Sequence, residues 1–95
     1  MPENHFLFQS GAIVCTPGAL RALLMAQTSA ADLIERHLRG DFGEIDEEDR
    51  QRNLVAINEE GRRVLSRYRL RTQTVIWAIT EADRSVTTLL LPDEY

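Results

Sequence analysis

Lysine is absent from the sequence, and all eleven basic residues are arginine. The absence excludes Schiff-base chemistry and every phosphate-binding loop that depends on a lysine. A bias of the coding DNA toward G and C explains the all-arginine count without any function. The physical consequence holds either way, because eleven planar guanidinium groups remain to bind carboxylates or phosphates through paired hydrogen bonds.

Cysteine and long apolar runs are also scarce. Cys15 is the single cysteine, so no disulfide can form within the sequence and a reducing compartment is expected. No apolar run approaches the roughly 20 residues that span a membrane. Residues 1–5 lack the basic start and the apolar stretch of a signal peptide. We therefore expect a cytoplasmic protein without a membrane partner.

The remaining composition suits one globular domain. Apolar residues make up 43% and charged residues 27% of the 95 residues, which is ordinary for a protein with a single core. No linker, repeat or low-complexity segment divides the chain. The sequence therefore predicts one domain that spans residues 1–95.

Three helices are predicted from their capping residues. Thr16 and Ser29 are suitable N-caps for a first and a second helix. Asp46 is an N-cap for a third helix, whose first turn is acidic, as the helix dipole favours. Gly40 and Gly61 mark the ends of the second and third helices. The apolar face expected for the first helix consists of Leu20, Leu23, Leu24 and Gln27.

The rest of the chain is typical of three strands, at about residues 62–70, 75–80 and 86–91. Residues 11–15 form a further short apolar segment that we expect to be extended. The strand at 75–80 is apolar on both faces, as a central strand requires. The predicted fold class is α+β, with N-terminal helices followed by an antiparallel three- to four-stranded β-meander packed on the helices. In the first strand Val64, Ser66, Tyr68 and Leu70 are expected to share one face, and Arg63, Leu65, Arg67 and Arg69 the other.

Residues 37–49 combine one of the two histidines with six carboxylates. His37 beside Asp41, Asp46 or Asp83 would provide an acid–base pair, so these four are the candidate catalytic residues of a small hydrolase or nuclease. The spacing matches no metal-binding signature, and neither a metal nor a cofactor is predicted. The alternative, which we favour, is structural: His37 packs between helix and sheet and binds a loop carbonyl or Asp41, while the acids cap the third helix.

Residues 62–71 carry five arginines around one tyrosine. A sheet face of this composition could bind a phosphate backbone and stack a base. The alternative is internal pairing with the acids of residues 41–49, and a net charge of −4 disfavours general binding of nucleic acid. The candidate binding residues are Arg63, Arg67, Tyr68, Arg69, Arg71 and Arg84 on the basic side, and Asp41, Glu44, Glu47 and Glu48 on the acidic side.

Several strings in the sequence resemble a family of small proteins found on bacterial plasmids and integrative elements. They cover most of the chain: T-P-G-A-L at 16–20, H-L-R-G-D-F-G-E-I at 37–45, E-D-x-x-x-N at 48–53, G-R-R-V-L-S-R-Y at 61–68 and I-W-A-I-T-E-A-D-R-S-V-T-T-L-L-L-P-D-E-Y at 76–95. The resemblance implies carriage on mobile DNA and supplies no activity. Some members are labelled as a type I restriction methyltransferase subunit, but this chain lacks the asparagine–proline tetrad and the room for a cofactor-binding domain.

Three functions follow from these observations. The leading hypothesis is an accessory protein, encoded by a mobile element, that binds a host or defence-system protein or nucleoprotein in an anti-defence or regulatory role. The alternatives are the small hydrolase or nuclease centred on His37, and a nucleic-acid-binding regulator that uses the arginine-rich strand at 62–71. A homodimer is also expected, because a sheet covered by helices on one side leaves its other face partly apolar.

Overall fold

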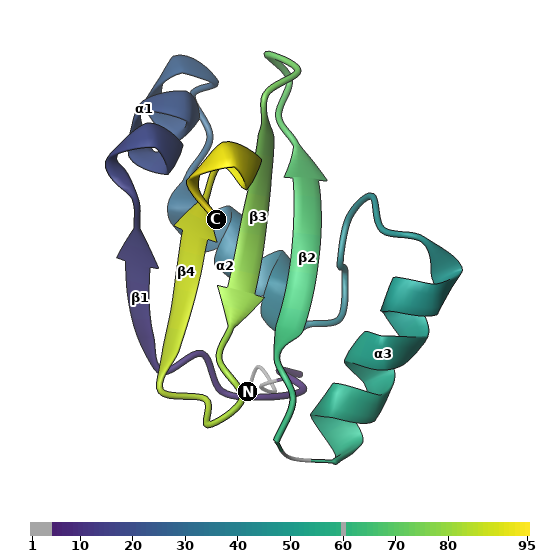
Figure 1. Ribbon diagram of the computed structural model, residues 1–95. Coiled ribbons are helices and arrows are strands. Elements are labelled where there is room, and N and C mark those ends of the chain that lie inside the picture. Colours follow the sequence, from purple (N-terminus) through teal and green to yellow (C-terminus); the bar gives the residue numbers. More distant parts are fainter. Residues whose placement is uncertain (1–4, 60) are drawn as a thin grey trace.

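The computed structural model describes residues 5–59 and 61–95. These residues form an α+β fold, as predicted, with three α-helices and a four-stranded sheet (Figure 1). In chain order the elements are β1 (Ala12–Cys15), α1 (Pro17–Met25), α2 (Ala30–Leu38), α3 (Glu47–Asn58), β2 (Val64–Arg69), β3 (Val75–Thr80), β4 (Val86–Leu90) and the 3₁₀ helix η1 (Pro92–Glu94).

The sheet is mixed, and the prediction of a purely antiparallel sheet was wrong in this respect. Its strand order is β1-β4-β3-β2. Strands β2, β3 and β4 form the predicted antiparallel meander, whereas β1 pairs with β4 in parallel, with Ala12 opposite Val86 and Cys15 opposite Leu89. A parallel pair needs a long crossover connection, and here all three α-helices and two strands lie between the paired strands.

The three predicted N-caps are confirmed. The hydroxyl of Thr16 accepts a hydrogen bond from the amide of Ala19, at 3.1 Å, at the start of α1. Ser29 caps α2 in the same way. The Asp46 carboxylate accepts from the amide of Asp49, at 2.7 Å, at the start of α3. Local capping chemistry therefore fixes where each helix begins.

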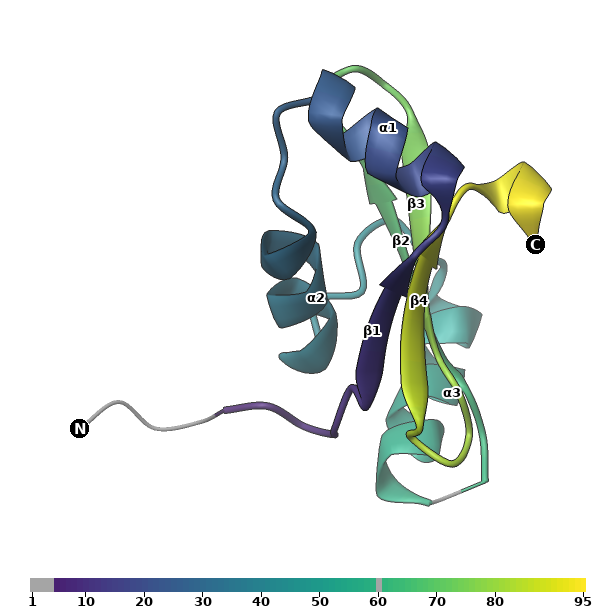
Figure 2. The same cartoon turned by 90° about the vertical axis from the view of Figure 1, so that its left-hand side faces the viewer.

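Helices α1 and α2 cover one face of the sheet (Figure 2). Helix α3 lies beside β2 at the edge of the sheet, and η1 lies across the opposite face. That face is called the open face below, because neither α1 nor α2 covers it. Among the described residues, no helix combines the length and the apolar character needed to cross a bilayer.

The main core lies between α1, α2 and the sheet. From α1 it receives Ala19, Leu23 and Ala26, whereas Leu20 and Leu24, which were predicted to share the core face with Leu23, are exposed. The face of β2 that the sheet contributes carries Val64, Ser66, Tyr68 and Leu70, which are all buried. The small alanines let α1 approach the sheet closely, which turns its two outer leucines away from the core.

Candidate functional site

His37 is buried between α2 and the sheet, and hydroxyl groups bind both of its ring nitrogens. Its Nδ1 lies 2.5 Å from Ser66 Oγ, and its Nε2 lies 2.9 Å from Thr80 Oγ1. Thr80 Oγ1 lies 2.6 Å from Thr87 Oγ1, which donates to the carbonyl of Ser10 at 2.7 Å. His37 therefore packs between helix and sheet, as favoured from the sequence, but its partners are hydroxyls and not Asp41 or a loop carbonyl.

The carbonyl of Ser10 sets the direction of every hydrogen bond in this chain of groups. Thr87 donates its proton to that carbonyl, so Thr87 must accept from Thr80. Thr80 then accepts from Nε2–H of His37, and the bare Nδ1 of His37 accepts from Ser66. The network is satisfied by a neutral imidazole protonated at Nε2.

The candidate catalytic residues do not come together. Burial, and then the positive charge of Arg84, lower the pKa of His37 to about 4, so the imidazole is neutral at pH 7. Asp41 forms an ion pair with Arg36 at 2.7 Å, and this guanidinium hydrogen bond lowers the pKa of the Asp41 carboxyl. Asp46 caps α3, and Asp83 accepts from the amide of Ser85 in a turn. Within residues 5–59 and 61–95, no three His, Cys, Asp or Glu side chains are grouped so as to hold a metal ion.

The arginine-rich strand is largely occupied by contacts within the molecule. The carboxylate of Glu44 lies 3.1 Å from Arg69 Nε and 3.4 Å from Arg67 Nη1. Arg71 donates to the carbonyl of Ala26. Tyr68 is buried and donates its hydroxyl proton to the carbonyl of Asp41, so its ring is not free to stack a base.

The remaining predicted binding residues also have partners in the described part of the chain. Glu47 pairs with Arg50, and Glu48 pairs with Arg52, along α3. The guanidinium of Arg84 donates to backbone carbonyls that include those of Arg62 and Ala56, so it ties the β3–β4 turn to α3. The acidic and basic segments therefore have a structural role, because their side chains form these contacts within the molecule.

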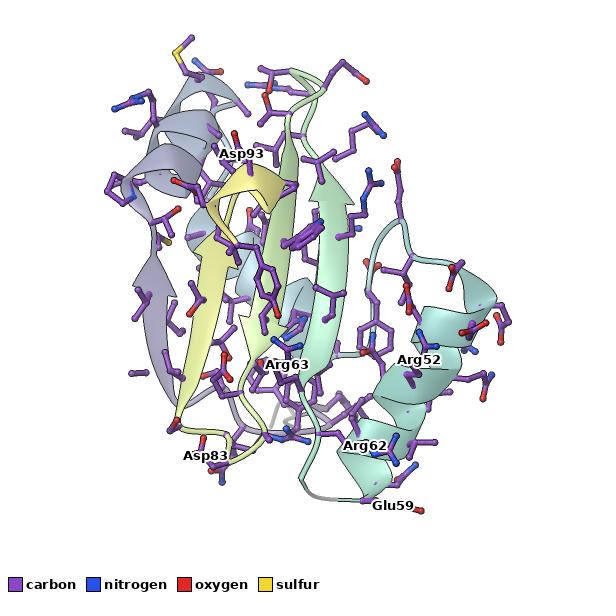
Figure 3. All side chains as sticks on the ribbon, in the orientation of Figure 1. Arg52, Glu59, Arg62, Arg63, Asp83 and Asp93 are labelled. Atoms are coloured by element: carbon purple, nitrogen blue, oxygen red, sulfur yellow. The ribbon has the colours of Figure 1, made fainter. Side chains whose placement is uncertain are left out.

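A pocket of about 420 Å³ opens where α3 meets the open face of the sheet. Side chains of β2 and β3 form its apolar base, α3 forms one wall, and Tyr95 lies beside it. Three arginines line it, and Figure 3 shows Arg52 on α3, Arg62 near the lower end of α3 and Arg63 in front of the strands. The nine lining residues are Asp49, Arg52, Asn53, Arg62, Arg63, Leu65, Trp77, Ile79 and Tyr95.

Trp77 gives the pocket its most unusual feature. Its indole nitrogen is buried and is the one buried side-chain donor or acceptor of the described residues without a hydrogen-bond partner. The ring of Tyr95 packs edge-on against it, with centroids 5.6 Å apart, and Tyr95 itself is 67% exposed. A buried donor without an acceptor is energetically costly, which makes the indole N–H a local defect in the packing beside the pocket.

Arg62 and Arg63 differ from Arg67 and Arg69 of strand β2. Neither forms an ion pair with a carboxylate of the described residues, whereas Arg67 and Arg69 share Glu44. Arg63 donates to the hydroxyl of Tyr95 and lies over its ring, 5.6 Å from the centroid. The pocket therefore has two guanidinium groups that form no ion pair with a carboxylate of residues 5–59 and 61–95.

Of the pocket residues, only Arg63 is among the candidate binding residues predicted from the sequence, although Arg62 belongs to the arginine-rich segment and Asp49 to the acidic one. Trp77 is predicted as part of a central strand with two apolar faces, and Tyr95 is named only as the end of the string at 76–95. The available signal was the alternation of β3, which places the single tryptophan on the same face as Leu65 and Ile79. No protein-family model, curated protein or solved structure matches the chain.

Proposed function

We propose that the protein is a non-enzymatic binding protein that holds an acidic segment of a partner protein in the pocket beside Trp77. The observation that carries this proposal is the coincidence of a buried, unpartnered indole N–H with two guanidinium groups that have no carboxylate partner in the described structure. An acidic segment supplies acceptors for the two guanidinium groups, and an apolar side chain beside the acid would occupy the base of the pocket next to the Trp77 ring.

The chemistry of the pocket favours a protein partner over nucleic acid. Leu65, Trp77 and Ile79 form an apolar base that suits an aliphatic or aromatic side chain, which a phosphate backbone does not supply. The arginines expected to follow a phosphate backbone, Arg67 and Arg69, are already bound to Glu44. With a net charge of −4, the protein lacks the long-range attraction on which nucleic-acid binding depends.

The resemblance to proteins of plasmids and integrative elements supports a partner from the host or from a defence system. A small protein of this kind would act by occupying a surface of that partner, in an anti-defence or regulatory role. The hydrolase alternative lacks support from the geometry, because His37 is buried and hydrogen-bonded to hydroxyls on both sides.

A display library of short random peptides tests the proposal without knowledge of the partner. We expect the enriched peptides to contain Asp or Glu next to an aromatic or aliphatic residue, because that pair matches the guanidinium groups and the apolar base. Binding of one enriched peptide, followed by fluorescence of the single tryptophan, should weaken about tenfold or more in Arg62→Gln/Arg63→Gln. The matched control is Arg50→Gln, which removes an exposed arginine of α3 outside the pocket.

Three results would contradict the proposal. Enriched peptides without acidic residues would show that the arginines do not select the ligand. A loss of binding free energy in Arg50→Gln that is half or more of the loss in the double variant would show that only overall charge matters, because the double variant removes two charges and the control one. A single-stranded oligodeoxythymidine that binds more tightly than every peptide, with the salt dependence of phosphate contacts, would favour the nucleic-acid reading instead.

A further inference from the structure

The outer edge of β1 presents unpaired backbone groups. Ala12 donates to the carbonyl of Ser85, and Thr16 donates to the carbonyl of Leu89, each at 3.0 Å. In this parallel register the backbone N–H and C=O groups of alternate residues, Ala12 and Val14, point toward β4. The N–H and C=O of Ile13 and Cys15 therefore point away from the sheet, and no described strand lies on that side.

The opposite edge of the sheet, at β2, is covered. The side-chain amide of Asn53 hydrogen-bonds both backbone groups of Leu65. The backbone of Arg67 donates to the carbonyl of Phe42 and accepts from the amide of Glu44. Proteins protect exposed edges with such covers, or with charged residues, proline or bulges. A short edge strand is a further protection, and β1, with the sequence Ala-Ile-Val-Cys, is the shortest strand of the sheet. Among the described residues it has no other protection, since it has no charged residue, proline or bulge and no covering strand.

The surface around this edge is apolar and almost uncharged. Ile13 is 53% exposed and Val14 is 46% exposed. Five of the nine large apolar side chains that the described residues expose lie between residues 13 and 25, on β1 and α1, which face the viewer in Figure 2. The only charged residue of β1 and α1 is Arg21. The five are Ile13, Val14, Leu20, Leu24 and Met25.

We propose that β1 of a second copy of this chain pairs antiparallel with β1, about a two-fold axis through Val14. Ile13 of each copy then exchanges both backbone hydrogen bonds with Cys15 of the other, and the two Val14 residues lie opposite each other. The two sheets become one continuous sheet of eight strands.

A second copy fits this edge better than an unrelated strand does. The occupant must be an extended segment with outward backbone groups at alternate residues, flanked by apolar and uncharged surface. The β1 and α1 surface of the chain meets each of these conditions itself. Molecules that each carry a net charge of −4 repel one another, but the paired surfaces contain no acidic residue, so the repulsion acts only at a distance.

Sedimentation equilibrium of the whole chain tests the assembly. We expect a mass of twice the 10.8 kDa of one chain. Ile13→Lys should return the mass to that of one chain, because it places two like charges at the new strand pair. The control Val55→Lys alters an apolar side chain of similar exposure on α3 and should leave the dimer intact.

Disulfide cross-linking provides a second readout that does not depend on Ile13→Lys. In a Cys15→Ser background, Val14→Cys places two thiols opposite each other, with Cβ atoms roughly 4.5–5.5 Å apart, and oxidation should link two chains rapidly. Val55→Cys in the same background should link far more slowly.

Three outcomes would overturn the proposal. The first is a wild-type chain that sediments as a monomer at every concentration. The second is a dimer that Ile13→Lys leaves unchanged. The third is equal cross-linking of the Val14→Cys and Val55→Cys variants, which would indicate random collision.

Discussion

Asn53 of α3 binds the backbone of Leu65 in the way a neighbouring strand would. Its Nδ2 donates to the Leu65 carbonyl at 2.7 Å, and its Oδ1 accepts from the Leu65 amide at 3.0 Å. Asn53 is buried, so these bonds are shielded from water. One side chain thus fixes the position of α3 and satisfies part of the β2 edge.

Replacement of Asn53 by alanine should destabilise the fold by about 2–3 kcal/mol, because it leaves the amide and carbonyl of Leu65 without partners. The measurement is the free energy of unfolding from urea titration. Asn58→Ala on the same helix is the matched control, because Asn58 donates only to an exposed helix carbonyl. Its cost should be smaller by at least about 1 kcal/mol, and equal losses would refute the special role of Asn53.

The pKa of His37 predicts how stability depends on pH. Its value is about 4 in the folded state, against 6.5 in the absence of the fold. The unfolded chain therefore binds more protons between these values, and the neutral His37 contributes stability that is complete above pH 6.5 and is lost as pH falls toward 4. Between pH 7.5 and pH 5, the free energy of unfolding should fall by about 2 kcal/mol.

The comparison with His37→Gln identifies the source of this loss. The variant lacks the titrating group, so its free energy of unfolding should change little between pH 7.5 and pH 5, whatever its absolute stability. The lowered pKa values of Asp41, Asp83 and Glu94 affect stability only below their ordinary values, which are outside this window. A slope that is unchanged in His37→Gln would show that another group titrates.

Gly43 lies where the loop before α3 meets β2, with φ at +72°. A Cβ atom there would lie far inside van der Waals contact with the carbonyl oxygen of Arg67. Gly43→Ala should therefore lower the free energy of unfolding by about 3 kcal/mol or more, because the alanine strains the backbone and forces the loop away from Arg67 of β2. Gly61→Ala is the control, because Gly61 also has a positive φ but open space around it, and its cost should be about 1 kcal/mol. Thermal unfolding of both variants separates the cost of the positive φ, which the two positions share, from the cost of the steric overlap, which occurs only at Gly43.

The secondary structure could be predicted from the sequence wherever local chemistry decides it. Thr16, Ser29 and Asp46 cap the helices expected of them. The alternation in β2 correctly separates buried from outward residues. The parallel pairing of β1 with β4 could not be predicted, because no local pattern in residues 11–15 specifies a partner some seventy residues away.

The candidate site was harder to predict, because it depends on which charges meet in space. The internal pairing of acidic and basic segments, weighed as one alternative, occurs at Glu44, whose loop position brings it to Arg67 and Arg69. Nothing in the spacing of the arginines distinguishes these two from Arg62 and Arg63. In the sequence Trp77 resembles an ordinary core residue. Its place in a pocket depends on the positions of α3 and of Tyr95, which only the tertiary structure shows.

Val14 and Trp77 lie on the same face of the sheet, because Val14 is level with Thr88 in β4, which in turn is paired with Ile79 in β3. A two-fold axis through Val14, perpendicular to the sheet, would bring both Trp77 pockets to one side of the assembly. Two weak sites on one rigid platform gain avidity, since the first contact raises the effective concentration for the second. A target with two acidic segments at the matching separation would then be held far more tightly than a target with one.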